Sequence, residues 1–107
     1  MRNDLVLIKL IEIIEKIRKY VSDVDYESFS SNDILVDACV FNLAQLGETA
    51  NKIDQNFEDS HPEIPWRQVY GLRNRIIHDY EGVNVKLIWE IIDGDLPDLF
   101  VKLQNLL

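Results

Sequence analysis

The chain has 107 residues, the size of one ordinary domain with a single hydrophobic core. Hydrophobic residues make up 47% of it and charged residues 28%, a balance typical of globular proteins that excludes a disordered chain. The formal net charge of −8 excludes broad, non-specific binding to nucleic acid, because neutralising phosphates requires a surplus of Lys and Arg on some face. Any nucleic-acid site must therefore be local.

The longest apolar run near the N-terminus is Leu5–Ile8. A run of this length is too short for the core of a signal peptide and far too short to span a bilayer. We therefore expect a cytoplasmic protein without membrane attachment.

The single cysteine, Cys39, lies in an apolar helical pattern. With no second cysteine, neither an internal disulfide nor a thiolate metal cluster can form. Asp37 carries the wrong sign to favour a reactive thiolate, so we expect a buried, structural thiol. No cluster of His, Asp and Glu shows the spacing of metal ligands, and no metal or other cofactor is expected.

Two amphipathic segments fill the first half of the chain. Over 3–21, apolar residues recur every three or four positions with charged residues between them, which predicts a long helix. The range 22–31 lacks this period, and Ser31, Asn32 and Asp33 can then cap a second helix over 34–53. That helix is apolar on more than one side, so we expect it to be the most buried. Its expected core band contains Leu35, Ala38, Cys39, Leu43, Leu46 and Ala50, widened by Ile34, Phe41 and Ala44.

A third helix is expected after the polar connector 54–64, because Pro65 suits the first helical turn. We expect it to end near residues 80–82, since Gly82 suits the left-handed position that closes a helix. Its expected core stripe consists of Trp66, Val69, Leu72 and Ile76.

The remaining residues predict one or two more helices. Asn84 can cap a fourth helix through Ile92, and the range 93–97 separates it from, or kinks it into, a final helix that ends at Leu107. No segment alternates with period two for long enough to be a strand. We predict one all-α domain over residues 1–107, a four- to five-helix up-and-down bundle.

The range 73–80 reads Arg-Asn-Arg-Ile-Ile-His-Asp-Tyr and holds the side chains best suited to chemistry. The guanidinium of Arg73 can bind phosphate as a planar fork, and the imidazole of His78 can transfer protons near pH 7. If the third helix continues through this range, Asn74 lies four residues before His78 on one face and can orient its ring. Arg73 and Tyr80 then share a neighbouring face. These groups are the minimum needed to cut a phosphodiester without a metal.

One histidine is not enough for RNA transesterification. The reaction needs a base for the 2′-hydroxyl proton and an acid for the 5′ leaving oxygen, together with positive charge for the transition state. A symmetric dimer would bring two copies of His78 and Arg73 into one cleft, and Gly71 would allow close helix approach. The motif therefore predicts a homodimer.

The order of these motifs resembles the HepT-like proteins of the HEPN (higher eukaryotes and prokaryotes nucleotide-binding) superfamily. The resemblance covers most of the chain, from Asp4 to the C-terminus, and its set of motifs in order is more specific than Arg-x4-His alone. Asn84 and Thr49 depart from it, standing where aspartate and alanine are usual. The matching residues are Arg73, Asn74, His78 and Tyr80, with Gly47-Glu48 and Ile64-Pro65-Trp66 upstream and Trp89 and Asp95-Leu96-Pro97 downstream.

The resemblance implies a metal-independent endoribonuclease that acts as the toxin of a toxin–antitoxin pair. It implies that Arg73 and His78 are catalytic, that Asn74 supports them, and that RNA is the substrate. The partner that it implies is a nucleotidyltransferase-fold antitoxin, which adds AMP to Tyr80. Added phosphate charge so close to His78 would fill the cleft and repel RNA.

Other interpretations of the same residues stay open at this stage. Glu48 is either a helix-surface acid or a buried partner that holds Arg73, and Tyr80 can simply cover a helix end. His61, next to a proline in a connector, is expected to be a loop residue and not a second catalytic base. The functional alternatives are a non-catalytic module that binds a nucleotide or a partner, and a purely structural subunit.

Overall fold

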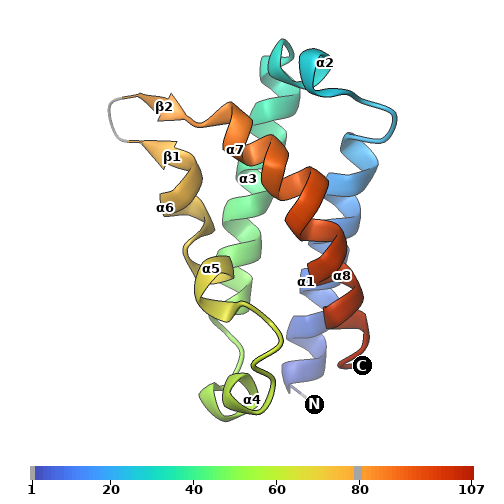
Figure 1. The fold of residues 1–107 in the computed structure, drawn as a ribbon. Coiled ribbons are helices and arrows are strands. Elements are labelled where there is room, and N and C mark those ends of the chain that lie inside the picture. The colour runs from blue at the N-terminus through green and yellow to red at the C-terminus, as the bar shows by residue number, and fades with distance from the viewer. Residues whose placement is uncertain (1, 79–80) are drawn as a thin grey trace.

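The computed structural model describes residues 2–78 and 81–107, and it is almost entirely helical (Figure 1). Two long helices, α1 (Arg2–Tyr20) and α3 (Asp33–Ala50), pack side by side, which confirms the predicted all-α class. Both end slightly before the expected residues 21 and 53. The other elements are α2 (Tyr26–Ser30), α4 (Gln55–Ser60), α5 (Trp66–Tyr70), α6 (Leu72–Ile76), β1 (Ile77–His78), β2 (Gly82–Val83), α7 (Val85–Glu90), the π-helical turn η1 (Ile91–Asp95) and α8 (Leu96–Gln104).

Two short helices, α2 and α4, lie in ranges where the sequence predicts none. In α2 the cause is local: the carboxylate of Asp25 accepts a hydrogen bond of 2.8 Å from the backbone N–H of Ser28. This N-cap compensates for the lack of an apolar period, and the same hydrogen bond lowers the pKa of Asp25. The expected caps Asn32 and Asn84 are confirmed, since each accepts from the backbone N–H three residues later at 3.1 Å.

The hydrophobic core lies between α1, α3, α5–α6 and the C-terminal helices. The stripe predicted for the third helix is buried, and so is the apolar side of α1 from Leu7 to Ile17. Of the band predicted for α3, four residues are buried and three are half-buried: Cys39, Leu43, Leu46 and Ala50, and Leu35, Ala38 and Ala44 respectively. Ile34 and Phe41 are the exception, because their side chains are 84% and 59% exposed. They lie seven residues apart, on the side of α3 away from its buried band, so their predicted core role is wrong. Cys39 is fully buried, as predicted.

The predicted third helix is wrong beyond Ile76. Gly71 divides it into α5 and α6, and at Ile77 the backbone turns extended, with φ −115° and ψ 124°. Ile77 and His78 form the strand β1, which pairs antiparallel with β2. In this pair Ile77 lies opposite Val83, and His78 lies opposite Gly82. Two consecutive β-branched isoleucines favour this change. Gly82 does adopt a positive φ of 80°, but it belongs to a hairpin and does not close a helix.

The C-terminal third of the chain is a continuous helical stretch where the sequence predicts a break or kink. Helix α7 passes through the wider turn η1 directly into α8 (Figure 1). Pro97 lies in the first turn of α8, where its missing N–H is tolerated. The turn η1 therefore accommodates the proline without interrupting the helix.

Helices α3 and α5 approach each other closely at Gly47 of α3. A Cβ at this position would lie 2.8 Å from the carbonyl oxygen of Val69 and 3.3 Å from that of Tyr70, both in α5. These are backbone atoms, so no side-chain rotation can make room. Within the protomer, a Cβ at Gly71 would meet only an ordinary 3.5 Å contact with the carbonyl oxygen of Arg67. The close approach predicted for Gly71 is one between two protomers, and it stays a prediction. The glycine that the packing requires is therefore Gly47.

Replacing Gly47 with alanine should lower the free energy of unfolding by about 1–3 kcal/mol, because the methyl group overpacks a backbone contact. The gain in helix propensity, up to about 1 kcal/mol, offsets only part of this loss. Gly94→Ala is the matched control, since a Cβ there meets nothing within 4 Å. Urea unfolding of both variants would measure the difference, and equal stability would contradict the proposed packing role.

Candidate active site

The residues of the predicted motif come from α6 and the hairpin that follows it. Arg73 and Asn74 lie on α6 and are exposed, while Leu72 and Ile76 anchor that helix in the core. Because α6 packs against α3, its register is fixed by these two buried side chains. Arg73 is therefore held on a short, anchored helix with its guanidinium accessible to a ligand.

His78 does not lie on the helix that carries Arg73 and Asn74. It follows directly in β1, where its backbone pairs with Gly82. The helical spacing that would bring Asn74 under the imidazole ends at Ile76, so this part of the predicted geometry is wrong. The hairpin projects from the edge of the bundle next to α6 (Figure 1). Tyr80, predicted to share a helix face with Arg73, lies outside the described residues.

Glu48 is exposed on α3, one position after the close contact at Gly47. Within the described part of the chain, no ion pair joins it to Arg73. Of the two roles left open for Glu48, the structure therefore places it as an acid on the helix surface. Ile34, Phe41 and Glu48 are spaced seven residues apart, so they form one stripe along the outer side of α3.

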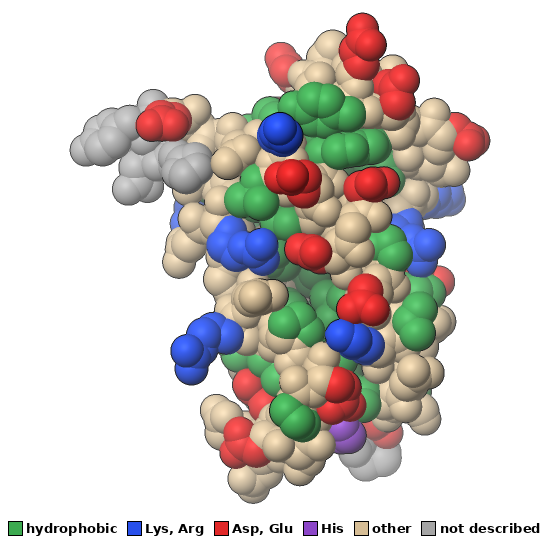
Figure 2. Space-filling model, viewed as in Figure 1, with side chains coloured by type: hydrophobic (Ala, Val, Ile, Leu, Met, Phe, Trp, Pro, Cys, Tyr) green, Lys and Arg blue, Asp and Glu red, His purple; other side chains and the backbone are tan. Residues whose placement is uncertain are grey.

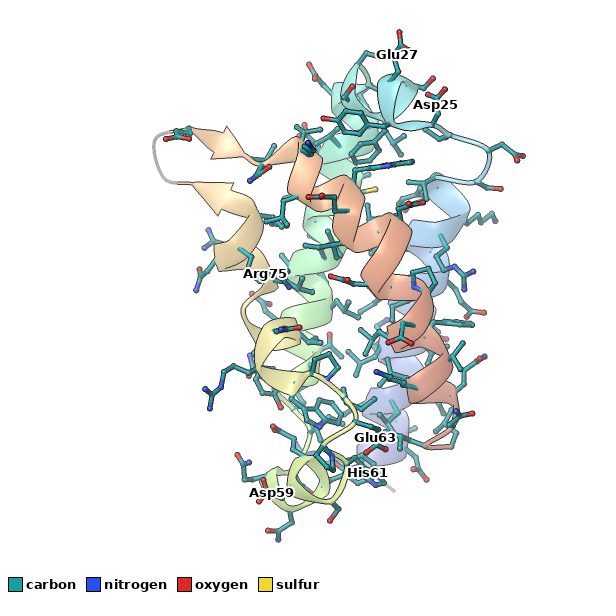
Figure 3. All side chains as sticks on the ribbon, in the orientation of Figure 1. Asp25, Glu27, Asp59, His61, Glu63 and Arg75 are labelled. Atoms are coloured by element: carbon teal, nitrogen blue, oxygen red, sulfur yellow. The ribbon has the colours of Figure 1, made fainter. Side chains whose placement is uncertain are left out.

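Neither of the other reactive side chains belongs to the motif. His61 ends α4 at the opposite end of the molecule from the hairpin, where its Nδ1 lies 3.2 Å from the Glu63 carboxylate and its ring packs on Phe57 (Figure 3). The prediction that it is a loop residue is confirmed. Burial raises the pKa of the Cys39 thiol to about 11, so it stays protonated at neutral pH.

A groove on the other side of α6 was not singled out by the sequence. It has a volume of about 410 Å³ and lies between α5–α6 and the stretch η1–α8; we call it the Arg75 groove. Arg75 extends from α6 toward this space (Figure 3). Positions 73 and 75 are about 200° apart around a helix, so Arg73 points away from the groove that Arg75 lines. This offset, which the sequence already contains, was the signal that Arg75 lies on a different side of α6 from Arg73.

No three His, Cys, Asp or Glu side chains gather as a metal site would require, as far as the structure describes the chain. Similarly, none of the helices in the described ranges combines the length and apolar character needed to cross a membrane.

An all-α bundle with an Arg-x4-His motif between α6 and a small hairpin defines a domain of the HEPN superfamily. The chain belongs to the ribonuclease HepT-like family, whose model matches residues 10–106. This confirms the resemblance read from the motifs, and the predicted HEPN-like fold with it.

Curated relatives cover most of the chain. A protein of Thermococcus cleftensis named "Probable ribonuclease HepT" is 34% identical over 95 residues, which are 89% of this chain and 86% of the relative. Two proteins named "Putative RNase" are also similar. The one from Caldanaerobacter subterraneus subsp. tengcongensis is 32% identical over 81% of this chain and 78% of its own. The one from Methanocaldococcus jannaschii is 31% identical over 87% and 85%. No solved structure matches the chain.

Proposed function

We propose that the protein is an endoribonuclease that needs no metal and acts as the toxin of a toxin–antitoxin pair. Membership of the ribonuclease HepT-like family carries this proposal, together with the names of the relatives. The exposure of Arg73 on an anchored helix supports it, because a guanidinium in that position can reach a phosphate.

The local charge of the motif segment also supports binding of RNA by this acidic chain. Residues 64–78 contain three arginines, at positions 67, 73 and 75, and no aspartate or glutamate. Figure 2 shows basic side chains along the α5–α6 side of the molecule, separate from the acidic groups over the C-terminal helices. A local excess of basic side chains is what a chain with net charge −8 requires to hold a phosphate backbone.

In the proposed reaction, a 2′-hydroxyl of RNA attacks the adjacent phosphorus and the 5′ oxygen of the next nucleotide leaves. One imidazole takes the hydroxyl proton and a second imidazole returns a proton to the leaving oxygen. Arg73 stabilises the negative charge that develops on the phosphoryl oxygens. His78 is the candidate for both proton transfers, which requires a copy from each of two protomers, with Asn74 as a polar neighbour.

The outer stripe of α3, formed by Ile34, Phe41 and Glu48, is our candidate contact between the two protomers. Its two apolar side chains are the largest exposed ones on that helix. A seven-residue spacing is the pattern by which two helices pack along a common seam. Helix α6 packs against α3, so a dimer formed there would bring the two motifs toward one another. Glu48 then lies at the end of the seam nearest α5, as a polar contact of the dimer.

Regulation by AMP addition completes the proposal. A nucleotidyltransferase-fold antitoxin would transfer AMP from a nucleoside triphosphate to the hydroxyl of Tyr80, forming a phosphodiester and releasing pyrophosphate. The added negative charge would lie two residues from His78 and would repel the RNA backbone.

Purified protein should cleave single-stranded RNA in the presence of a chelator, and His78→Ala should reduce the rate by about 10²–10⁴-fold because the proton transfers are lost. Arg73→Ala should reduce it by about 10²–10³-fold. His61→Ala is the matched control, because His61 lies outside the motif and already contacts Glu63, and it should keep nearly full activity. Tight nucleotide binding without any cleavage would instead favour a non-catalytic binding module.

Phe41→Glu should convert the protein to a monomer and abolish RNA cleavage, because it places a charge in the centre of the proposed seam. Val101→Glu is the matched control, since Val101 is a similarly exposed apolar residue on α8. Analytical ultracentrifugation would measure both, and a dimeric Phe41→Glu protein would rule out this interface.

Co-expression with the candidate antitoxin should increase the intact mass by whole AMP units, and Tyr80→Phe should prevent the increase. Loss of RNA cleavage should accompany the modification. A neutralised complex with an unmodified tyrosine would show inhibition by binding alone.

A further inference from the structure

The Arg75 groove has the construction of a site for one small, flat ligand. Its inner walls are aliphatic and come from buried residues on both sides, among them Leu72 of α6, Ile91 of η1 and Leu99 of α8. At about 410 Å³ it falls in the ordinary size range of ligand sites. Figure 2 shows apolar side chains between acidic and basic ones on this face.

Two of the acidic groups at the rim are already engaged. The Asp98 carboxylate lies 2.9 Å from the ammonium of Lys102, and the Glu63 carboxylate lies 3.2 Å from the His61 ring. Neither acid is therefore available without breaking a contact. The rim charges that remain are those of Arg75 and Asp95.

Arg75 and Asp95 lie on opposite sides of the groove, on α6 and η1. Among the side chains that the structure describes, neither forms an ion pair or a hydrogen bond. Asp95 occupies the N-cap position of α8, yet its carboxylate accepts no capping hydrogen bond there. A half-buried arginine and an exposed carboxylate without a partner thus line a shared apolar space. Asp95 belongs to a π-helical turn, a feature often found at functional sites.

An unstacked nucleobase fits this combination. The faces of a base suit aliphatic walls, and its edge carries N–H donors for a carboxylate. The phosphate of the same nucleotide suits a guanidinium. Single-stranded RNA is recognised through such splayed bases. Helix α6 is about 10–12 Å across with its side chains, so a strand held at Arg73 reaches the groove within a few nucleotides.

We propose that the Arg75 groove is a base-selecting subsite for the RNA strand beside the cut, an inference that rests on the proposed ribonuclease function. Asp95 accepts hydrogen bonds from the amino edge of the base, and Arg75 binds the phosphate of the same nucleotide. Cytosine, adenine and guanine offer an exocyclic amino group or paired donors to the carboxylate. Uracil offers one N–H between two carbonyl oxygens, which the carboxylate repels. The subsite therefore disfavours uracil at one fixed position relative to the cut.

Sequencing the cut sites in a random pool of single-stranded RNA tests this inference. Wild-type protein should show uracil depleted about 5- to 100-fold at one fixed offset, the range expected when a good base contact is lost. Asp95→Asn keeps the size of the side chain but can also donate to a uracil carbonyl. This variant should restore uracil at that offset and change the total cleavage rate far less than His78→Ala does.

A groove-filling variant provides a second, independent measurement. Gly94 lines the groove, and a Cβ there meets nothing within 4 Å, so Gly94→Phe introduces bulk without a backbone clash. It should remove the base preference, whereas Gly94→Ala, the matched control, should keep it. If Gly94→Phe fails to fold, as a thermal melt would reveal, the result of Asp95→Asn decides alone.

The outcomes separate this inference from the proposed function. If wild-type protein cleaves RNA and His78→Ala does not, while Asp95→Asn and Gly94→Phe leave the cut-site preference unchanged, the subsite is wrong and the ribonuclease stands. The subsite is equally wrong if these variants lose binding to a partner protein and keep their RNA preference. If wild-type protein cleaves no RNA, both proposals fall.

Discussion

The contact of Gly47 with the backbone of α5 is the constraint on which the rest of the candidate site depends. With only 2.8 Å between a Cβ position of α3 and the Val69 carbonyl oxygen, the two helices lie as close as their backbones permit. Because α5 is followed after a single residue by α6, the same contact fixes where α6 can pack on α3. The position of Arg73 is thus set by a glycine 26 residues earlier in the chain.

The break after Ile76 then divides the motif between two kinds of backbone. Arg73 keeps the rigidity of a helix anchored by Leu72 and Ile76, while His78 enters a strand that is paired over only two residues. A short ladder at the edge of a bundle has few contacts to hold it, so its free energy of local opening is low compared with that of the core. Under the proposed mechanism, a second protomer packed against this strand would hold His78 in place. The short pairing of β1 therefore supports the proposed composite site, in addition to the count of histidines.

Much of the fold could be predicted from the sequence because the core follows helical periodicity. The stripes of α1 and of Trp66, Val69, Leu72 and Ile76 survive in the structure, even though Gly71 divides the helix that was expected to carry the latter stripe. Periodicity predicted the wrong burial or the wrong backbone where the outcome depends on how the helices pack and which strands pair. Ile34 and Phe41 widen the apolar band of α3 in the sequence, yet both are mostly exposed in the structure. The Ile76-Ile77 pair fits a helical pattern as well as a strand, and only pairing with Gly82 and Val83 decides between them.

The candidate residues and the helical offset between Arg73 and Arg75 could be read from the sequence. Which of the two faces a groove could not, because that depends on where α3 and α8 pack. That division bears on how an acidic protein can act on RNA. Three arginines in the segment 64–78, each neutralising one phosphate, would give a salt slope of only about −2 for a single strand. Such binding is weak, and it carries no sequence information. Selectivity for particular RNA must then come from contacts other than phosphate neutralisation.

Arg75 is the one motif arginine placed in a groove with apolar walls and an unused carboxylate, so it can contribute to both charge and selection. Arg73, on the exposed side, can contribute charge alone.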